Sequence, residues 1–494
     1  MKDTNNTIQA FWVIIGSLSA FAFTIVSSMI LSRYFDKTDY GTYKQIMYTY
    51  NTLLTVFTLG LPRAYSYFLP RVSNSEAKDI ISKINYILIG SGVIMSLTIF
   101  LGADLIAVFL KNEELGSPLR WFSLVPLFML PTMGLEGILA TYKKTKILAF
   151  YNISTKVLML LCVVVPIIIF NGNVKDAVIG FTIASFISFV IALYLKNLPV
   201  RNEVKSKSSY TFKDIFKYST PIMMAGIWGV LILSSDQFFI SRYFGTEVFA
   251  DFANGSLQLP FVGMIVSATS IVLAPLYSKL AFNNTAESKE DIIRIWKSVF
   301  EKTIKMIYPL VVFFFCFADI IMVVLYGGKY ENSGDYFKIK LIVNFFTLIS
   351  YGPLVLSIGG HKYYYKVHMY GAFILISLEF LAVKYIDSPL AIVWISVICQ
   401  IGRIFAMLYF IANFLGLKLI KLFPFKLIVN LLFPAFLILY GVRFVLIQLL
   451  NLNDVLLLIS SSVFYAIFFG AWVYYKKISY YSIFKPLISK ISKK

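Results

Sequence analysis

Charge, cysteine and histidine are all scarce in this chain of 494 residues. Only 14% of the residues are charged, and there are three cysteines and two histidines. Soluble proteins carry about 25% charged residues, so this chain has too few to cover a water-facing surface. The three cysteines lie within apolar runs and form no CxxC pair, which is typical of buried hydrophobic positions. These shortages exclude a cytosolic enzyme, a disulfide-stapled secreted protein and a soluble nucleic-acid binder.

Sequence motifs of catalysis are also missing. The chain holds no GxxxxGK[ST] phosphate loop, no HExxH zinc motif and no GxSxG nucleophile elbow. The loops between its apolar runs are too short to hold a soluble catalytic domain. We therefore expect no enzyme activity, no metal and no cofactor, apart from protons or sodium ions that would drive transport.

Long apolar runs dominate what is present, since 59% of the residues are hydrophobic. A membrane-spanning helix needs about 20 mostly apolar residues, and fourteen runs meet that length. They lie at about 10–33, 43–67, 84–108, 118–141, 147–170, 175–195, 214–242, 248–277, 303–326, 336–359, 366–384, 388–414, 424–447 and 453–475. The sequence predicts an all-α integral membrane protein with about fourteen transmembrane helices. The first run is too long for a signal peptide and is interpreted as a retained span.

Positive charge supports this count. There are 45 Lys and Arg against 25 Asp and Glu, a formal net charge of +20. With the N-terminus inside, the even-numbered turns and both chain ends carry roughly three times as many Lys and Arg as the opposite side, as the positive-inside rule requires. We expect a multi-pass protein of the bacterial cytoplasmic (inner) membrane with both termini in the cytoplasm. The basic charge then needs no nucleic-acid partner.

A short motif recurs six spans apart. The first span ends on Ser32–Phe35 (SRYF), and the seventh ends on the same four residues, Ser241–Phe244. Tyr40 and Tyr43 then fall opposite Phe249 and Phe252 at constant offset. A six-span unit keeps its orientation when it is repeated, so the pattern predicts a parallel pseudo-repeat. We expect one six-helix lobe at 1–205, a second at 206–415, and an additional helix pair with a basic tail at 416–494.

These features resemble one family of membrane carriers. Two six-span lobes, two extra helices and the turn Tyr40–Tyr43 (YGTY) are similar to the polysaccharide flippase (Wzx-like) branch of the multidrug/oligosaccharidyl-lipid/polysaccharide exporter superfamily. Residues 234–279 match best, with Asp236, the aromatic turn and Pro275. The resemblance implies a flippase that moves undecaprenyl-pyrophosphate-linked oligosaccharides outward by alternating access, for O-antigen, capsule or exopolysaccharide assembly. Its partners would be this lipid-linked saccharide, membrane lipids and other polysaccharide assembly proteins.

Basic residues inside the spans are the candidate substrate contacts. An intramembrane charge costs about 2.5–3.5 kcal/mol on insertion scales, so each needs a cavity, a partner or a route to the interface. Arg63 follows Gly60 and Pro62, which weaken the helix, and guanidinium binds phosphate bidentately. Arg403 and Lys156 are further candidates for a cationic cavity. The alternatives are structural pairing for the arginines and reach to the interface for Lys156.

Acidic residues inside the spans have two interpretations. Asp236 and Glu136 are candidates for proton or sodium coupling, or else they form fixed ion pairs with intramembrane arginines. The glycines beside Glu136 permit close helix approach. Arg443 lies near the outer end of its span, and we expect it to reach the lipid headgroups.

Three aromatic side chains near these charges are candidate sugar contacts: Tyr65, Tyr67 and Trp228. The alternative is a purely structural role, in which these side chains pack within the helical bundle.

Other functions remain open from the sequence. A multidrug cation antiporter of the same superfamily should have an acidic or apolar cavity, which Arg63 and Arg403 disfavour. A peptidoglycan-precursor lipid flippase shares the fourteen-span layout and a cationic cavity. A membrane polymerase or glycosyltransferase would need a long outer loop or an acidic metal-nucleotide motif, and neither is found.

Overall fold

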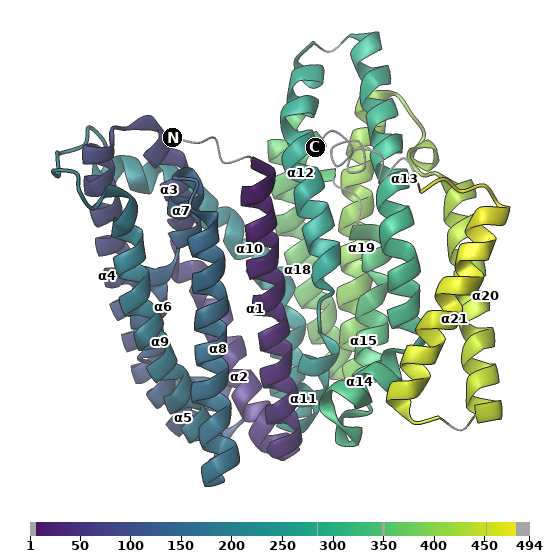
Figure 1. Ribbon diagram of the computed structural model, residues 1–494, viewed down its shortest axis with the longest axis horizontal. Helices are drawn as coiled ribbons and strands as arrows, with labels where there is room; N and C mark the ends of the chain where they lie inside the picture. Colours follow the sequence, from purple (N-terminus) through teal and green to yellow (C-terminus); the bar gives the residue numbers. More distant parts are fainter. Residues whose placement is uncertain (1–5, 284, 348–350, 451, 481–494) are drawn as a thin grey trace. The chain divides into compact units, whose positions relative to one another are not determined.

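The computed structural model describes residues 6–283, 285–347, 351–450 and 452–480 (Figure 1). Over these ranges all regular secondary structure is helical. Among the described residues, eleven helices are long and apolar enough to cross a membrane, and two bent helix pairs raise the number to thirteen. The predicted all-α integral membrane fold is confirmed, with fewer regular spans than the fourteen expected.

The predicted second span accounts for the difference. Residues 43–67 fall on α2 (Lys37–Phe57) and α3 (Pro62–Phe68), which are separated by a break where Leu59 and Gly60 have positive φ. α2 is too polar to pass as a span, and its polar side chains are buried against partners. Gln45 donates a 2.7 Å hydrogen bond to Ser241 Oγ, and Asn112 donates a 2.6 Å bond to Gln45 Oε1. Because these groups are satisfied, a polar helix is tolerated inside the helical unit.

Two compact units make up the chain, Met1–Ala250 and Asp251–Lys494. In the first, α1 packs along α8, α8 along α9, and α2 along α10, while α3 lies against α7 (Figure 1). Besides α2 and α3, this unit contains α1 (Asn6–Tyr34), α4 (Asn74–Phe109), α5 (Gly116–Phe122), α6 (Val125–Met129), α7 (Leu135–Thr141), α8 (Thr145–Phe170), α9 (Val174–Asn197) and α10 (Phe212–Phe244), and α11 (Thr246–Gly255) begins here.

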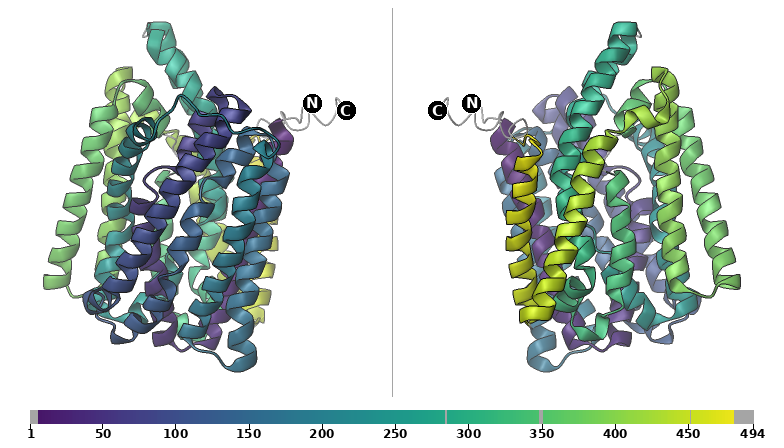
Figure 2. Two further views of the ribbon diagram at one scale, coloured as in Figure 1. Left: turned by 90° about the vertical axis from the view of Figure 1, so that its left-hand side faces the viewer. Right: turned by 90° about the vertical axis from the view of Figure 1, so that its right-hand side faces the viewer.

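The second unit is built around α13, which packs against α12 and α20. α20 and α21 lie side by side, as do α18 and α19 (Figure 2). Its helices are α12 (Pro260–Asn283), α13 (Ala286–Cys316), α14 (Ala318–Tyr326), α15 (Ser333–Ile342), α16 (Asn344–Thr347), α17 (Tyr351–Ser357), α18 (His361–Tyr385), α19 (Pro389–Leu415), α20 (Phe425–Leu450) and α21 (Asp454–Tyr475). α13 and α14 meet at a bend of 72°.

The predicted fourth span is irregular. The apolar stretch Glu113–Thr141 consists of α5, α6 and α7 joined by short 3-10 turns. Prolines 118, 126 and 131 interrupt its hydrogen-bond ladder, and Gly134 adopts a left-handed conformation just before α7. The first unit therefore contains two interrupted segments, α2–α3 and α5–α7, and each ends in a seven-residue helix.

Both copies of the SRYF motif end a long helix. The first closes α1 and the second closes α10, and Ser32 and Ser241 are fully buried. The aromatic positions that follow, Tyr40 and Tyr43 in one copy and Phe249 and Phe252 in the other, are buried as well. The motif thus has the same local structure at both places, and the expected lobe boundaries (1–205, 206–415 and 416–494) stay predictions.

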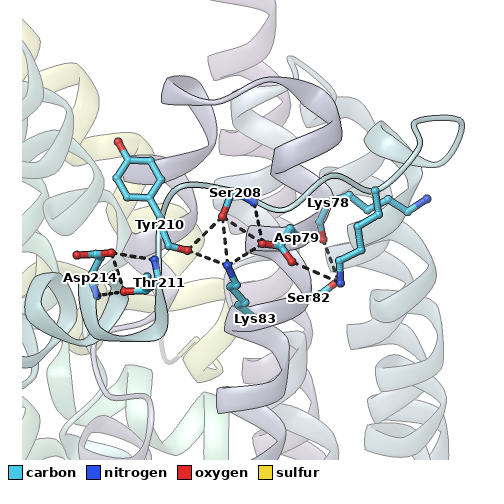
Figure 3. Close-up of polar contacts among 9 residues, drawn as sticks. Lys78, Asp79, Ser82, Lys83, Ser208, Tyr210, Thr211 and Asp214 are labelled. Carbon is cyan, nitrogen blue, oxygen red and sulfur yellow. Dashed lines mark hydrogen bonds and ion pairs between the residues drawn. The ribbon is translucent and has the colours of Figure 1, made fainter.

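The segment between α9 and α10 is fastened to α4 (Figure 3). Asp79 accepts hydrogen bonds from the backbone N–H and the hydroxyl of Ser208, both at 3.1 Å. Lys83 forms a 2.7 Å ion pair with Asp79 and donates a 2.8 Å bond to the Tyr210 carbonyl. We call this group of Asp79, Lys83, Ser208 and Tyr210 the linker clamp. The linker clamp therefore holds the basic segment between α9 and α10 against α4.

Candidate functional site

α3 is a short helix with two distinct faces. Ala64, Tyr65 and Phe68 are buried, whereas Arg63 and Ser66 are exposed. The helix is short because Pro62 lies at its start and Pro70 follows its end. This division points the Arg63 guanidinium away from the core of the first unit, with Ser66 one turn further along the same face.

Two glycines let α7 lie directly against α3. A Cβ on Gly134, whose φ is +81°, would lie 2.3 Å from the Tyr65 ring, and one on Gly137 would lie 2.7 Å from Ser66 Oγ. Gly134 is required by its conformation and by this contact, whereas a methyl at Gly137 would displace only the Ser66 hydroxyl. The close helix approach predicted from these glycines is confirmed. Glu136, between them in sequence, is exposed.

A buried lysine holds the buried side of α3 to the turn before α7. Lys196, near the end of α9, has a relative exposure of 0%. Its ammonium donates to the hydroxyl of Tyr65 at 3.1 Å, to Asn85 Oδ1 at 2.9 Å and to the Met133 carbonyl at 2.6 Å. Tyr65 in turn donates a 2.6 Å bond to Asn85. We call Lys196, Tyr65, Asn85 and Met133 the Lys196 cluster.

The Lys196 cluster joins four parts of the first unit: α3, α4, the turn before α7, and α9. All three ammonium protons have acceptors, so the buried cation is fully hydrogen-bonded. Sequence reasoning assigned Lys196 to a cytoplasmic loop and missed this role. The signal in the sequence was Asn85, a lone amide in the run KINYILIG, which needs a polar partner when buried.

Arg63, Ser66 and Glu136 therefore form one exposed polar group on two helices in contact. Within the described chain, Arg63 and Glu136 form no ion pair with each other, and Arg63 keeps its donors available. Short helices after Gly/Pro breaks are where transporters place substrate sites, because the breaks leave backbone groups and side chains facing a ligand. This group, the α3–α7 site, can bind an anion through the Arg63 guanidinium.

The predicted aromatic contacts have different surroundings. Tyr65 is fully buried in the Lys196 cluster. Tyr67 is half-buried and stacks on Tyr218 at 4.1 Å, with the Arg71 guanidinium 3.5 Å above its ring. Trp228 is half-buried on α10. Their roles as sugar contacts stay predictions.

Arg403 lies in the second unit, on α19, and is half-buried. Its side chain crosses α18 at Gly371, where an added Cβ would lie 2.5 Å from Arg403 Cδ. Tyr351, Tyr364 and His368 lie within electrostatic range of its guanidinium, and Tyr364 stacks on His368 at 4.2 Å. Arg403 thus faces phenol and imidazole groups rather than a carboxylate ion pair.

The remaining candidates lie apart from the α3–α7 site. Lys156 is half-buried on α8. Asp236 is 1% exposed on α10, and its Oδ1 accepts the backbone N–H of Gln237 at 2.8 Å. In the ranges that the structure covers, no group of three or more His, Cys, Asp or Glu side chains is placed to hold a metal ion.

Arg443 has a carboxylate partner within the second unit. It forms a bidentate ion pair with Asp319, with nitrogen–oxygen distances of 3.0 and 2.6 Å, and it also donates to the Cys316 carbonyl. Its expected contact with lipid headgroups stays a prediction. The 72° bend between α13 and α14 brings Asp319 toward α20 and makes this pair. The interpretation of intramembrane acids as ion-pair partners of arginines holds for Asp319.

Comparison with solved structures identifies the fold. The chain is similar to a lipid II flippase, MurJ, in an inward closed conformation, with a TM-score of 0.70 and 14% identity over 97% of this chain and 100% of that one. It is also similar to an inward-facing multidrug resistance MATE transporter, with a TM-score of 0.62 and 13% identity over 80% of this chain and 94% of that one. A Vibrio cholerae MATE transporter, VcmN, is similar with a TM-score of 0.56 and 14% identity over 82% of this chain and 95% of that one. These likenesses establish a membrane-transporter fold shared by carriers of different substrates.

The sequence itself assigns the family. No curated protein sequence matches the chain. The family model described as polysaccharide biosynthesis protein matches residues 11–335, about two thirds of the chain, including the α3–α7 site and the repeated SRYF motif. The chain therefore belongs to the polysaccharide biosynthesis protein family and has the fold of the MurJ and MATE transporters.

Proposed function

We propose that the protein is a flippase that moves undecaprenyl-pyrophosphate-linked oligosaccharides across the cytoplasmic membrane by alternating access. The product would supply the assembly of a surface polysaccharide such as O-antigen, capsule or exopolysaccharide. The family match supports a role in polysaccharide synthesis, and the transporter fold supports movement rather than catalysis. The inner membrane, cytoplasmic termini and polysaccharide assembly partners belong to the same proposal.

The observation that carries this proposal is the exposed Arg63 on the interrupted α2–α3 segment. A phosphate group of a pyrophosphate presents two oxygens that can accept two parallel hydrogen bonds from the planar guanidinium. An organic cation gains nothing at such a residue. The exposure of Arg63 thus favours an anionic lipid-linked substrate over a cationic drug.

Arg403 and Lys156 complete the proposed cationic contacts, and Asp236 and Glu136 the proposed coupling groups. Of the two acids, Glu136 is better placed to exchange an ion during transport, because its side chain is exposed while that of Asp236 is buried. Binding of a proton or a sodium ion would neutralise the Glu136 carboxylate, whereas the anionic substrate itself would not.

A lipid II flippase is the second candidate, since a protein of that function shares this fold over nearly the whole chain. Lipid II also carries a pyrophosphate, so Arg63 suits both substrates. The family match to polysaccharide biosynthesis favours the oligosaccharide.

The test is a translocation assay with purified protein in liposomes that contain pyrophosphate-linked glycolipid. An added enzyme modifies only outward-facing glycolipid, so the modified fraction reports transport. Arg63→Ala should slow transport about 10–100-fold, the equivalent of one charge-assisted contact. Arg63→Lys should retain part of the transport rate, because lysine keeps the positive charge but cannot donate two parallel hydrogen bonds to the phosphate.

Arg294→Ala is the matched control, since Arg294 is an exposed arginine on α13 that pairs with Asp291. It should transport at the wild-type rate. Wild-type protein that moves lipid II faster than the oligosaccharide lipid would favour the second candidate. Export of organic cations with no glycolipid movement would overturn the proposal.

A further inference from the structure

A cationic pocket lies in the second unit, and its lining includes neither Arg403 nor any residue of the α3–α7 site. Its volume is about 530 Å³. It lies where α13, the turn before α20 and the end of α21 converge. Its charged lining consists of Lys297, Lys305, Lys421, Lys426, Lys477 and Glu301.

The sequence places these lysines together through three elements. Lys297, Glu301 and Lys305 are spaced by four residues and so share one face of α13. Lys421 lies in the 3-10 turn Leu419–Leu422 before α20, and Lys426 is the second residue of α20. Lys477 follows α21 by two residues.

Hydrogen bonds between these elements hold the pocket in shape. The Trp296 indole on α13 donates a 3.1 Å bond to the Leu422 carbonyl. Lys305 donates a 3.1 Å bond to the Ser479 carbonyl, and the Tyr480 hydroxyl donates a 3.0 Å bond back to the Lys305 carbonyl. The pocket is therefore part of the folded unit rather than a chance gap between loose chain ends.

Positive charge in the pocket is not compensated. Five ammonium groups face one carboxylate, and in the part of the chain that the structure describes none of the five forms an ion pair with Glu301 or another acid. Like charges gathered at one site repel one another unless an anion binds among them. The ligand should therefore carry negative charge and several hydrogen-bond acceptors.

The rest of the lining indicates a lipid. Phe423, Phe425 and Leu427 form an apolar wall, and Phe425 is exposed. α20 and α21 are candidate membrane spans, and the pocket lies at their ends, the level of lipid headgroups. Basic pockets between spans at this level bind phosphate-containing headgroups, whereas a free anion has no use for the apolar wall.

We propose that this pocket binds the phosphate headgroup of an anionic phospholipid of the surrounding leaflet, with the lysines on the phosphate and the phenylalanines against the start of the acyl chains. The lining of this pocket shares no residue with the α3–α7 site, and the proposal does not depend on the proposed transport function.

Native mass spectrometry of the full-length protein in neutral detergent tests the proposal, with added phosphatidylglycerol or phosphatidylcholine. Wild-type protein should bind phosphatidylglycerol at least about tenfold more tightly than phosphatidylcholine. A surface lysine contributes about fivefold to anionic lipid binding, so Lys297→Ala/Lys421→Ala/Lys426→Ala should remove this preference. Lys302→Ala/Lys362→Ala/Lys366→Ala is the matched control, because it removes three exposed lysines outside the pocket and should keep the preference.

Equal phosphatidylglycerol preference in the pocket variant and the wild type would overturn the proposal. Binding of added inorganic phosphate or pyrophosphate at these lysines, with no lipid preference, would overturn it in favour of a soluble anion. If the triple variant does not fold, Lys421→Gln/Lys426→Gln changes only exposed side chains. The affinity of this double variant for phosphatidylglycerol should then fall about 25-fold, if the two lysines act independently.

Discussion

Lys196 donates a 3.1 Å hydrogen bond to the hydroxyl of Tyr65, and this contact joins the end of α9 to α3. Tyr65 lies two residues after Arg63 on the opposite face of that helix. The direction of the Arg63 guanidinium thus depends on a residue 133 positions further along the chain. The buried ammonium is a positioning group for the α3–α7 site.

Replacing Lys196 should destabilise the first unit. Lys196→Met keeps the length of the side chain but leaves the Met133 carbonyl without its donor and removes one bond each from Tyr65 and Asn85. We expect the free energy of unfolding to fall by about 1–3 kcal/mol, the cost of leaving buried polar groups unsatisfied. Thermal unfolding of the purified protein measures this. Lys213→Met, at an exposed lysine on α10, should melt as the wild type does. Equal melting of the two variants would refute a structural role for the cluster.

Gly134→Ala should disrupt the contact between α3 and α7. Its φ of +81° is unfavourable for alanine, and the new methyl would lie 2.3 Å from the Tyr65 ring. We expect a loss of about 1–3 kcal/mol in the free energy of unfolding, from the backbone strain and the overpacking together. Gly90→Ala on α4 is the control, because no atom lies within 4 Å of its added Cβ. That substitution should be neutral or stabilising, since alanine favours helix. A stable Gly134→Ala protein would show that α7 moves easily away from α3.

The helical membrane fold was predictable because hydrophobic length is a strong signal. The second span shows where that signal fails. Within residues 43–67, Gly60 and Pro62 predicted a weakened helix, and the structure breaks it there, at Leu59 and Gly60. The sequence did not reveal that the polar residue Gln45 would find a partner on α10. That contact depends on packing against a segment far away in the chain.

The candidate site shows a similar division. Gly134 and Gly137 predicted a close helix contact, because small residues in an apolar helix commonly lie where another helix packs closely. The exposure of Arg63 and the burial of Tyr65, two residues apart, follow from the rotation of α3, which its own seven residues do not determine. The pairing of Arg443 with Asp319 could not be assigned from the sequence for the same reason, because Asp319 is brought near by a bend that has no proline or glycine at its centre.

Removing the carboxylate of the linker clamp should release the linker. In Asp79→Ala, Ser208 loses both of its bonds to the carboxylate and Lys83 loses its ion pair (Figure 3). Local opening that becomes easier by about 1–2 kcal/mol makes the opened state roughly 5–30-fold more populated. Trypsin should then cleave after Lys205 and Lys207 faster by that factor, as followed by mass spectrometry. Asp176→Ala removes a capping carboxylate at the other end of α9 and should leave this cleavage unchanged. Unchanged cleavage in Asp79→Ala would mean that the clamp does not restrain the linker.

The Arg443–Asp319 pair should be energetically coupled. Its two hydrogen bonds have the fork geometry that makes arginine–carboxylate pairs strong, and the Arg443 side chain is only 23% exposed. Because Asp319 is 49% exposed, solvent screening limits the expected coupling to about 1 kcal/mol in a double-mutant cycle of Arg443→Ala and Asp319→Ala. The pair Arg294–Asp291 provides the matched cycle, since it is an exposed pair within one helix and should couple by about 0.3 kcal/mol. Chemical unfolding of the six proteins and the wild type gives both values. If the two couplings are equal, the bend between α13 and α14 is not held by its ion pair, and Arg443 is free to serve the headgroup role that its sequence position indicated.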